Sequence, residues 1–218
     1  VKLGTQGIII GHGTDTLAIT AAALSFMFES LPIPVILVGS QRSSDRGSSD
    51  AGMNLICAAE FISQTDFTGV GICLHESSDD ASCIILPATK TRKLHTSRRD
   101  AFKVVNDTPI ARVDYDSKEI KFFKKIIKSK KEVVLKDKLE EKVAIIKTYV
   151  NLSPVLINAL IKEKFKGLVL EVTGIGQAPT NIKENLPNYH ALQKFIQQGG
   201  VVVLTSQCIF GRVHSDIY

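Results

Sequence analysis

The stretch Ile8-Ile-Ile-Gly-His-Gly-Thr-Asp-Thr16 decides the fold, because it joins a buried strand to a helix through a turn of polar side chains. Three consecutive isoleucines are typical of a parallel strand that is covered on both faces. The run from Leu17 to Phe28 is apolar on nearly every side and predicts a helix with little solvent-exposed face. A ligand would meet Thr14 and Asp15 at the carboxyl end of the strand, where open α/β sheets bind small molecules and helix amides can hold an anionic group.

The unit of strand, polar loop and helix is repeated further along the chain. Residues 34–39 predict a second strand and residues 40–49 a polar loop. Asp50 is expected to cap the helix that follows and runs through Phe61.

Two shorter apolar runs, residues 69–74 and 84–86, predict further strands. Residues 90–100 are rich in hydroxyl and basic side chains and have no apolar period, which indicates a loop that faces a ligand or partner. A solvated surface loop is the alternative.

A second α/β pattern occupies the last third of the chain. Ser153 is the expected N-cap of a helix, with Pro154 at its first position. The other expected elements are strands at 142–147, 167–172 and 201–204 and a helix at 188–198.

The composition changes between the two patterned regions. Residues 114–142 are Lys-rich with isolated apolar pairs, as in a linker or an exposed hairpin. We therefore expect an α/β fold of two doubly wound, Rossmann-like domains, a larger one over residues 1–113 and a smaller one over 143–218. Both are expected to be incomplete, because the first strand begins almost at once and the last lies close to Tyr218.

The formal net charge of +5 is concentrated in one segment. Residues 118–142 hold 10 Lys against 5 Asp and Glu, which leaves 17 basic and 17 acidic residues in the rest of the chain. The distribution excludes an extended basic groove, although contact between nucleic acid and this segment is an alternative to a solvated surface.

The overall composition is that of a globular protein, with 44% hydrophobic and 22% charged residues. No apolar run approaches the roughly 20 residues that span a bilayer, and no signal-peptide pattern opens the chain, so we expect a soluble, cytoplasmic protein without membrane contact. Cys57, Cys73, Cys83 and Cys208 include no Cys-x-x-Cys pair and no His at ligand spacing. They predict free, mostly buried thiols and no metal site.

Thr14 and Asp15 are the strongest candidates for chemistry. Thr caps helices and Asp complements the helix dipole, so a structural role is one explanation. The other is a hydroxyl, a carboxylate and a Lys brought from elsewhere, which together could activate a nucleophile. His12 and His95 do not indicate a Ser-His-Asp triad, because no Gly-x-Ser-x-Gly elbow is present.

Several segments resemble the L-asparaginase and glutaminase family. Gly11-His-Gly-Thr-Asp-Thr16, followed by Thr20-Ala-Ala-Ala-Leu-Ser-Phe26, is similar to a family signature. Arg92-Lys-Leu-His-Thr-Ser-Arg-Arg-Asp-Ala-Phe102 resembles the catalytic-lysine segment in the form found in the glutaminase subunit of archaeal glutamyl-tRNA(Gln) amidotransferases. Val38-Gly-Ser-Gln-Arg-Ser-Ser-Asp-Arg-Gly-Ser-Ser-Asp50 and Thr205-Ser-Gln-Cys-Ile-Phe-Gly-Arg212 resemble the same branch.

The resemblance implies an asparaginase-type fold and a set of site residues. Thr14, Asp15 and Lys93 would form the catalytic relay that polarises an amide and activates a hydroxyl or water. Gly13 and Ser40 would bind the substrate.

The implied reaction is hydrolysis of glutamine, or of asparagine, with release of ammonia to the partner subunit of the amidotransferase, which converts glutamyl-tRNA(Gln) to glutaminyl-tRNA(Gln). The resemblance implies no cofactor in the glutaminase subunit, since ATP and Mg are used by the partner. We expect the partner to hold most of the tRNA, because the charge outside residues 118–142 sums to zero. The resemblance also implies a homodimeric core.

One feature of the family is missing from this sequence. The family's first catalytic threonine lies in a Thr-Gly-Gly-Thr type turn, which this chain lacks upstream of Gly7. We therefore expect the chain by itself to be inactive. A stand-alone L-asparaginase and a non-catalytic tRNA-binding or scaffold module are the alternative functions.

Overall fold

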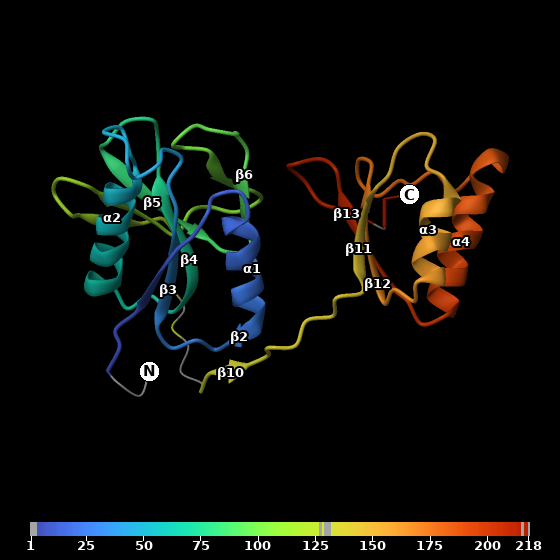
Figure 1. Cartoon of the computed structure of the whole chain (residues 1–218), viewed down its shortest axis with the longest axis horizontal. Coiled ribbons are helices and arrows are strands. Elements are labelled where there is room, and N and C mark those ends of the chain that lie inside the picture. Colours follow the sequence, from blue (N-terminus) through green and yellow to red (C-terminus); the bar gives the residue numbers. More distant parts are fainter. Residues whose placement is uncertain (1–3, 127, 129–131, 215, 218) are drawn as a thin grey trace. The chain divides into compact units, whose positions relative to one another are not determined.

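The computed structural model describes residues 4–126, 128, 132–214 and 216–217. The chain forms two compact units, Val1–Lys138 (unit 1) and Leu139–Tyr218 (unit 2), shown in Figure 1. Each is an α/β unit built on a sheet with parallel strands, so the expected fold class is confirmed.

Unit 1 is built on a six-stranded sheet. Its order is β1 (Ile8–Gly11), β3 (Pro34–Val38), β4 (Gly69–His75), β5 (Ser82–Pro87), β8 (Ala111–Asp114) and β9 (Ile120–Phe122). β1, β3 and β4 are parallel, whereas β5, β8 and β9 continue the sheet antiparallel. The polar segments after β1 and β3 therefore come together at one edge of the sheet.

Helices α1 (Leu17–Met27) and α2 (Ala51–Gln64) cover opposite faces of this sheet, as Figure 1 shows. Neighbouring residues of β3 point into different cores on the two faces of the sheet. Ile36 packs with the core that includes Phe61 of α2, whereas Leu37 packs with the core that includes Leu17 of α1. This alternation is the period of two expected for a strand buried on both faces.

The expectation that α1 has little solvent-exposed face is wrong for unit 1. Only Leu17 and Ala21 are fully buried, while Ile19 and Phe26 are 68% and 71% exposed. Because the helix is apolar all round, its sequence does not indicate which side faces the sheet.

Part of the segment at 90–100 is a strand rather than a loop. β6 (Thr91–Lys93) pairs antiparallel with β7 (Phe102–Val104), and the connection between them carries the remaining polar residues. A three-residue strand is too short to show a period of two, which explains why the sequence did not indicate it.

The Lys-rich segment contributes to unit 1. β8 and β9 form a hairpin at the edge of the sheet, and β10 (Val134–Leu135) pairs with β2 (Phe28–Glu29) after α1. Residues 127 and 129–131 of this segment lie outside the described residues.

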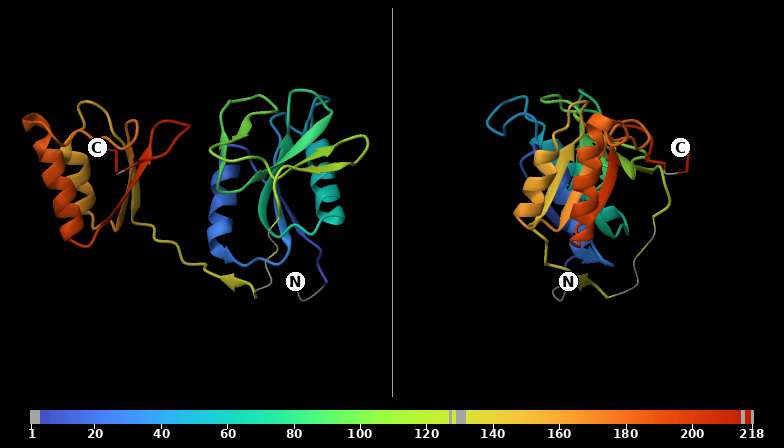
Figure 2. Two further views of the ribbon diagram at one scale, coloured as in Figure 1. Left: turned by 180° about the vertical axis from the view of Figure 1, so that it is seen from behind. Right: turned by 90° about the vertical axis from the view of Figure 1, so that its right-hand side faces the viewer.

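Unit 2 has a parallel sheet in the order β11 (Val143–Lys147), β12 (Gly167–Val172) and β13 (Val201–Ser206), connected by α3 (Pro154–Lys162) and α4 (Leu186–Gln197), with a 3₁₀ turn at Lys183–Asn185. Both helices lie on the same face in Figures 1 and 2 and share one core. On the other face, Ile145, Val201 and Val203 are exposed.

The two expected helix caps differ. Ser153 accepts a hydrogen bond from the backbone N–H of Val155 and caps α3 as expected. Asp50 stands at the N-cap position of α2, but its side chain makes no capping bond to a backbone N–H of the helix, so this expectation is wrong. Its carboxylate accepts instead from the backbone N–H groups of Gln41 and Arg42.

Candidate active site

The turn between β1 and α1 is held rigidly at the edge of the sheet. The N–H of His12 donates to the carbonyl of Val38 at 2.8 Å and so extends the pairing of β1 and β3 by one residue. The Nδ1–H of the His12 ring donates to the carbonyl of Gly13 at 2.7 Å, and Nε2 accepts from the hydroxyl of Thr20 at 2.9 Å. His12 is thus a structural residue of the turn, in agreement with the absence of a Ser-His-Asp triad.

Gly39 lies directly against this turn. A Cβ atom at position 39 would be 2.9 Å from the carbonyl oxygen of His12 and 3.0 Å from the Cγ2 atom of Thr14. Both distances are below normal van der Waals contact, so only glycine allows the end of β3 to approach Thr14 this closely.

Lys93 contacts Thr14 and Asp15, which lie 79 and 78 positions earlier in the sequence. Its Nζ atom donates to the Oγ1 atom of Thr14 at 3.0 Å and to the Oδ1 atom of Asp15 at 2.7 Å. The three residues that the family resemblance indicated as a catalytic relay are therefore in direct contact, although their catalytic roles stay predictions.

The β6–β7 hairpin delivers Lys93 to this position. Lys93 pairs with Phe102, and the N–H of Leu94 donates to the carbonyl of Ala101 at 2.7 Å. Ala101 and Phe102 are buried in the same core as Leu17, the first residue of α1. The hairpin and the helix that follows the Thr14 turn thus share one apolar core.

The environments of the two charged groups differ. The Lys93 side chain is 17% exposed, whereas the Asp15 side chain is 93% exposed. The hydrogen bond from Lys93 and the positive charge of its ammonium group lower the pKa of Asp15 below the ordinary value of 3.8.

Helix capping does not explain Thr14 and Asp15. The N-cap position of α1 belongs to Thr16, whose side chain makes no capping bond, and the first turn of the helix contains no acidic residue. The Thr14 hydroxyl instead meets an amine, which as a neutral base could remove its proton and as an ammonium ion can stabilise an oxyanion.

The two expected substrate-binding residues lie beside the relay. Gly13 is exposed, and its carbonyl accepts from His12. Ser40 follows Gly39 directly and is half-buried. In the described part of the chain, no hydrogen bond joins the Ser40 side chain to Thr14, Asp15 or Lys93, so a substrate contact of Ser40 stays a prediction.

A shallow pocket opens at the relay. Its volume is about 340 Å³, and its lining includes Asp15, Lys93, Leu94, His95 and Thr96. The size is suitable for a small molecule. The ring nitrogen Nδ1 of His95 accepts from the N–H groups of Ser97 and Arg98, which shapes the loop at this wall.

Buried polar residues near the relay were not indicated by the sequence. Asn54, within α2, and His75, at the end of β4, are 0% and 1% exposed and hydrogen bond to each other at 2.6 Å. His75 comes directly after the apolar run at 69–74 that predicted the strand. Its burial depends on contacts 21 positions away, which no local pattern shows.

Other sequence features take no part in the relay. Cys57, Cys73 and Cys83 are buried free thiols as expected, whereas Cys208 is exposed. Among the residues that the structure describes, no three His, Cys, Asp or Glu side chains are grouped so that they could hold a metal ion. Over the same residues, no helix is long and apolar enough to cross a membrane.

Comparison with known proteins gives a family for both units. The family model "Asparaginase, N-terminal" matches residues 1–128, and "Glutaminase/Asparaginase C-terminal domain" matches residues 142–218.

Curated relatives are named as the D subunit of glutamyl-tRNA(Gln) amidotransferase. The protein of that name from Pyrococcus furiosus is 46% identical over 99% of this chain and 48% of its own length, and the one from Methanococcus maripaludis is 44% identical over 100% of this chain and 51% of its own. The chain thus spans about half the length of the curated relatives it matches.

Solved structures of L-asparaginases share the fold. The thermostable L-asparaginase from Thermococcus kodakarensis has a TM-score of 0.86 at 31% identity and matches 99% of this chain and 61% of its own. L-asparaginase I from Vibrio cholerae has a TM-score of 0.85 at 28% identity, over 100% of this chain and 62% of its own. The chain therefore belongs to the glutaminase/asparaginase family, and among its relatives are the D subunits of glutamyl-tRNA(Gln) amidotransferases.

Proposed function

We propose that this chain belongs to the glutaminase subunit of a tRNA-dependent amidotransferase and that the relay of Thr14, Asp15 and Lys93 serves amide hydrolysis. The contact of Lys93 Nζ with the Thr14 hydroxyl carries the proposal. An amine, a hydroxyl and a carboxylate in one hydrogen-bonded set match the chemistry of nucleophilic acyl transfer from a carboxamide.

In the proposed reaction, a hydroxyl adds to the carboxamide carbon of glutamine and a tetrahedral oxyanion forms. Lys93 and Thr14 take up the proton of the nucleophile and pass it to the leaving nitrogen, so ammonia departs and an acyl ester remains. Backbone N–H groups near the Gly13 turn stabilise the oxyanion, and water then releases glutamate. Asp15 fixes the Lys93 ammonium in place between proton transfers.

The proposal includes the partners that the family resemblance implied. Ammonia passes to the partner subunit of the amidotransferase, which uses ATP and Mg to activate glutamyl-tRNA(Gln) and holds most of the tRNA, while the glutaminase subunit needs no cofactor and forms a homodimeric core. The chain by itself holds no Thr-Gly-Gly-Thr turn to supply the attacking hydroxyl. We therefore expect the 218-residue chain alone to show negligible amidase activity.

Two alternatives make different predictions. A stand-alone L-asparaginase is the second candidate, supported by the asparaginase structures that share this fold. A tRNA-binding scaffold would rely on free lysines in residues 118–142. However, Lys124, Lys128 and Lys136 are engaged by Asp107, Asp66 and Glu29, which weakens this alternative.

The deciding experiment measures turnover of glutamine and asparagine by the full-length protein, with and without its partner subunit and glutamyl-tRNA(Gln). We expect glutamine to be preferred and the partner complex to stimulate its hydrolysis. Replacing Lys93 with Met should lower turnover about 100-fold or more, because general acid–base catalysis contributes this much. Lys103→Met is the matched control, since Lys103 lies on the same hairpin but pairs with Asp100. Normal turnover in Lys93→Met would refute the relay, and partner-independent preference for asparagine would favour the second candidate.

A further inference from the structure

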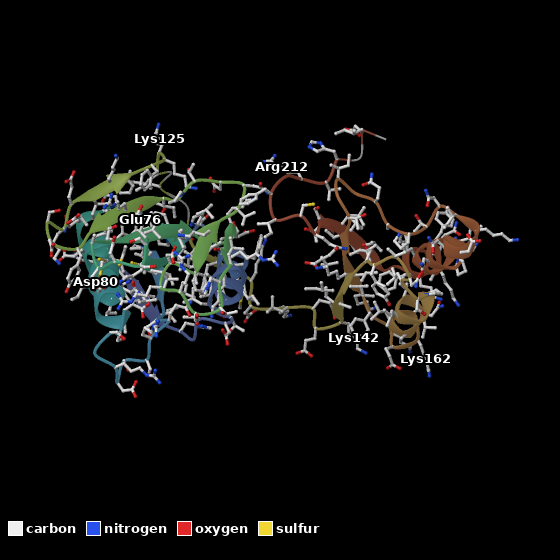
Figure 3. All side chains as sticks on the ribbon, turned by 90° about the horizontal axis from the view of Figure 1, so that it is seen from above. Glu76, Asp80, Lys125, Lys142, Lys162 and Arg212 are labelled. Carbon is white, nitrogen blue, oxygen red and sulfur yellow. The ribbon has the colours of Figure 1, made fainter. Side chains whose placement is uncertain are left out.

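A series of hydrogen-bonded polar side chains connects the two elements that carry the relay; Asn54 and His75 are buried in it, whereas the Asp80 side chain is 70% exposed. It begins at Gly39, on which the Thr14 turn rests, and passes through Asn54, His75 and Asp80 to Arg99. Arg99 lies in the connection between β6, which ends at Lys93, and β7. Figure 3 labels Asp80, in the loop after β4. None of these side chains contacts Lys93 or Thr14 directly through a hydrogen bond in the part of the chain that the structure describes.

Asn54 holds the end of β3. Its Nδ2 atom donates to the carbonyl of Gly39 at 2.9 Å, and the side chain is 0% exposed. The same Nδ2 atom is 3.4 Å from the carboxylate of Asp50, which in turn accepts from the N–H groups of Gln41 at 3.0 Å and Arg42 at 2.9 Å. The backbone on both sides of Ser40 is therefore held by Asn54 of α2 and by Asp50, the residue at its N-cap position.

The orientation of Asn54 determines how His75 must bind. The Gly39 carbonyl can only accept, so the nitrogen of the Asn54 side chain faces Gly39 and its oxygen faces His75. His75 Nδ1 then donates to this oxygen at 2.6 Å, while its Nε2 lies 3.2 Å from a carboxylate oxygen of Asp80. The His75 ring thus bridges the Asn54 side chain of α2 and the loop that carries Asp80.

Arg99 closes the chain at the Lys93 hairpin. Its Nη1 donates to Asp80 at 2.6 Å and its Nη2 donates to the carbonyl of Ser48 at 2.7 Å. The guanidinium group, on a side chain only 18% exposed, thus ties the loop at 40–49 to the connection that follows Lys93. Its planar fork of donors reaches the two partners from two different nitrogen atoms.

We propose that Asn54, His75 and Arg99 are positioning residues that set the distance between Thr14 and Lys93. This inference rests on the proposed function and adds residues that support the relay without touching the substrate. The bonded chain fixes the glycine on which Thr14 rests at one end and the Lys93 hairpin at the other. Removing one buried member leaves its neighbours unpaired, which is more costly than loss of an exposed bond.

The first test compares substitutions in the full-length protein. Asn54→Leu keeps a similar volume but removes the bonds to Gly39 and His75. We expect kcat for glutamine to fall about 10-fold or more and KM to change less than about 3-fold, because misplaced reacting groups lower the rate of chemistry more than they weaken binding. Phe61→Leu, in the same helix, is the control for loss of stability. The Phe61 side chain lies in the apolar core and has no polar group that could bond to Asn54, His75, Asp80 or Arg99.

A pair of substitutions at position 75 tests for rescue. His75→Leu should lower kcat as Asn54→Leu does. His75→Asn places an amide N–H near the position of Nδ1 and should recover part of the loss, since it can still donate to Asn54. A kcat within about 2-fold of the parent in both Leu variants, or an equal loss in Phe61→Leu, would overturn the inference.

Amide hydrogen exchange separates this inference from the proposed function. In Asn54→Leu, the amides of Gln41 and Arg42 should exchange at least about 10-fold faster than in Phe61→Leu, whether or not glutamine is hydrolysed. Faster exchange in a protein without amidase activity would refute the proposed function and retain the network as a support of the loop. Unchanged exchange would refute the network even if the parent protein hydrolyses glutamine.

Discussion

Gly39 makes the close approach between β3 and the Thr14 turn possible. In Gly39→Ala, the new Cβ would come within 3.0 Å of the His12 carbonyl, a backbone group, and of the Thr14 side chain, which is hydrogen bonded to Lys93. We expect a loss of about 1–3 kcal/mol in the free energy of unfolding, measured by denaturant titration, because overpacking forces backbone shifts. Glutamine turnover should fall as well, since Thr14 moves relative to Lys93.

The matched control for Gly39→Ala is Gly47→Ala, in the same polar loop. A Cβ atom at position 47 meets no atom within 4 Å. This variant should retain the stability and the turnover of the parent protein. Equal stability of Gly39→Ala and Gly47→Ala would show that the turn can relax without cost.

The pKa of Asp15 reports directly on its contact with Lys93. The hydrogen bond and charge of Lys93 lower this pKa below 3.8, so the pair stabilises the folded state above the pKa of the unfolded chain and loses this contribution as the pH falls through the folded pKa. In Lys93→Met, the pKa of Asp15 should rise, which a carboxyl-carbon NMR titration would measure. The same titration in Lys103→Met should match the parent. A pKa that stays equally low without Lys93 would contradict the contact.

At the residue scale, the sequence predicted part of the candidate site. Thr14 and Asp15 stood out because they follow three consecutive isoleucines, but the expectation that this strand is buried on both faces is wrong: β1 is the edge strand of the sheet, and Ile8 is 43% exposed. Their partner Lys93 lies 79 positions from Thr14 and was indicated only by family resemblance. Asn54 and His75 gave no signal, since a buried polar residue is defined by the groups that surround it in the fold and not by its neighbours in sequence.

At the scale of single helices, a side-chain cap is a measurable difference between α3 and α1. Ser153 caps α3 through a bond to the N–H of Val155 at 3.3 Å, whereas Thr16 at the start of α1 makes no side-chain cap. We expect Ser153→Ala to lower the free energy of unfolding by about 0.5–2 kcal/mol. Thr16→Ala, measured by the same thermal or denaturant unfolding, should lower the free energy of unfolding by clearly less. The reverse order would show that the capping bond contributes little.

The elements that the sequence predicted well are those whose pattern is local. β3 and β4 are continuous apolar runs, and Ser153-Pro154 marks the start of α3 by cap and proline. β6 and β10 are too short for any period, and each exists because a distant strand pairs with it. The buried side of α1 was not predictable for another reason: a helix without a polar face can pack any of several sides against the sheet.

At the scale of the whole molecule, each unit has its own apolar core. The residues of the unit 2 core come from α3, α4, the three strands of its sheet and nearby loops, all within residues 139–218. The two cores of unit 1 are built from residues within 1–138. Domains with separate cores can open separately, so a local change in one need not alter the stability of the other.

Phe195→Leu tests this separation. Phe195 is 2% exposed in the unit 2 core, so its loss should destabilise that unit by about 2 kcal/mol through a cavity. Hydrogen exchange should accelerate at amides of β12 and α4, while the amides of Gln41 and Arg42 and the pKa of Asp15 in unit 1 stay unchanged. In Phe61→Leu, we expect faster exchange at the amides of α2 and an unchanged exchange rate at the amides of α4. Acceleration throughout the chain in both variants would mean that the two units unfold as one cooperative body, in which case a substitution in either core would change the stability of the relay of Thr14, Asp15 and Lys93.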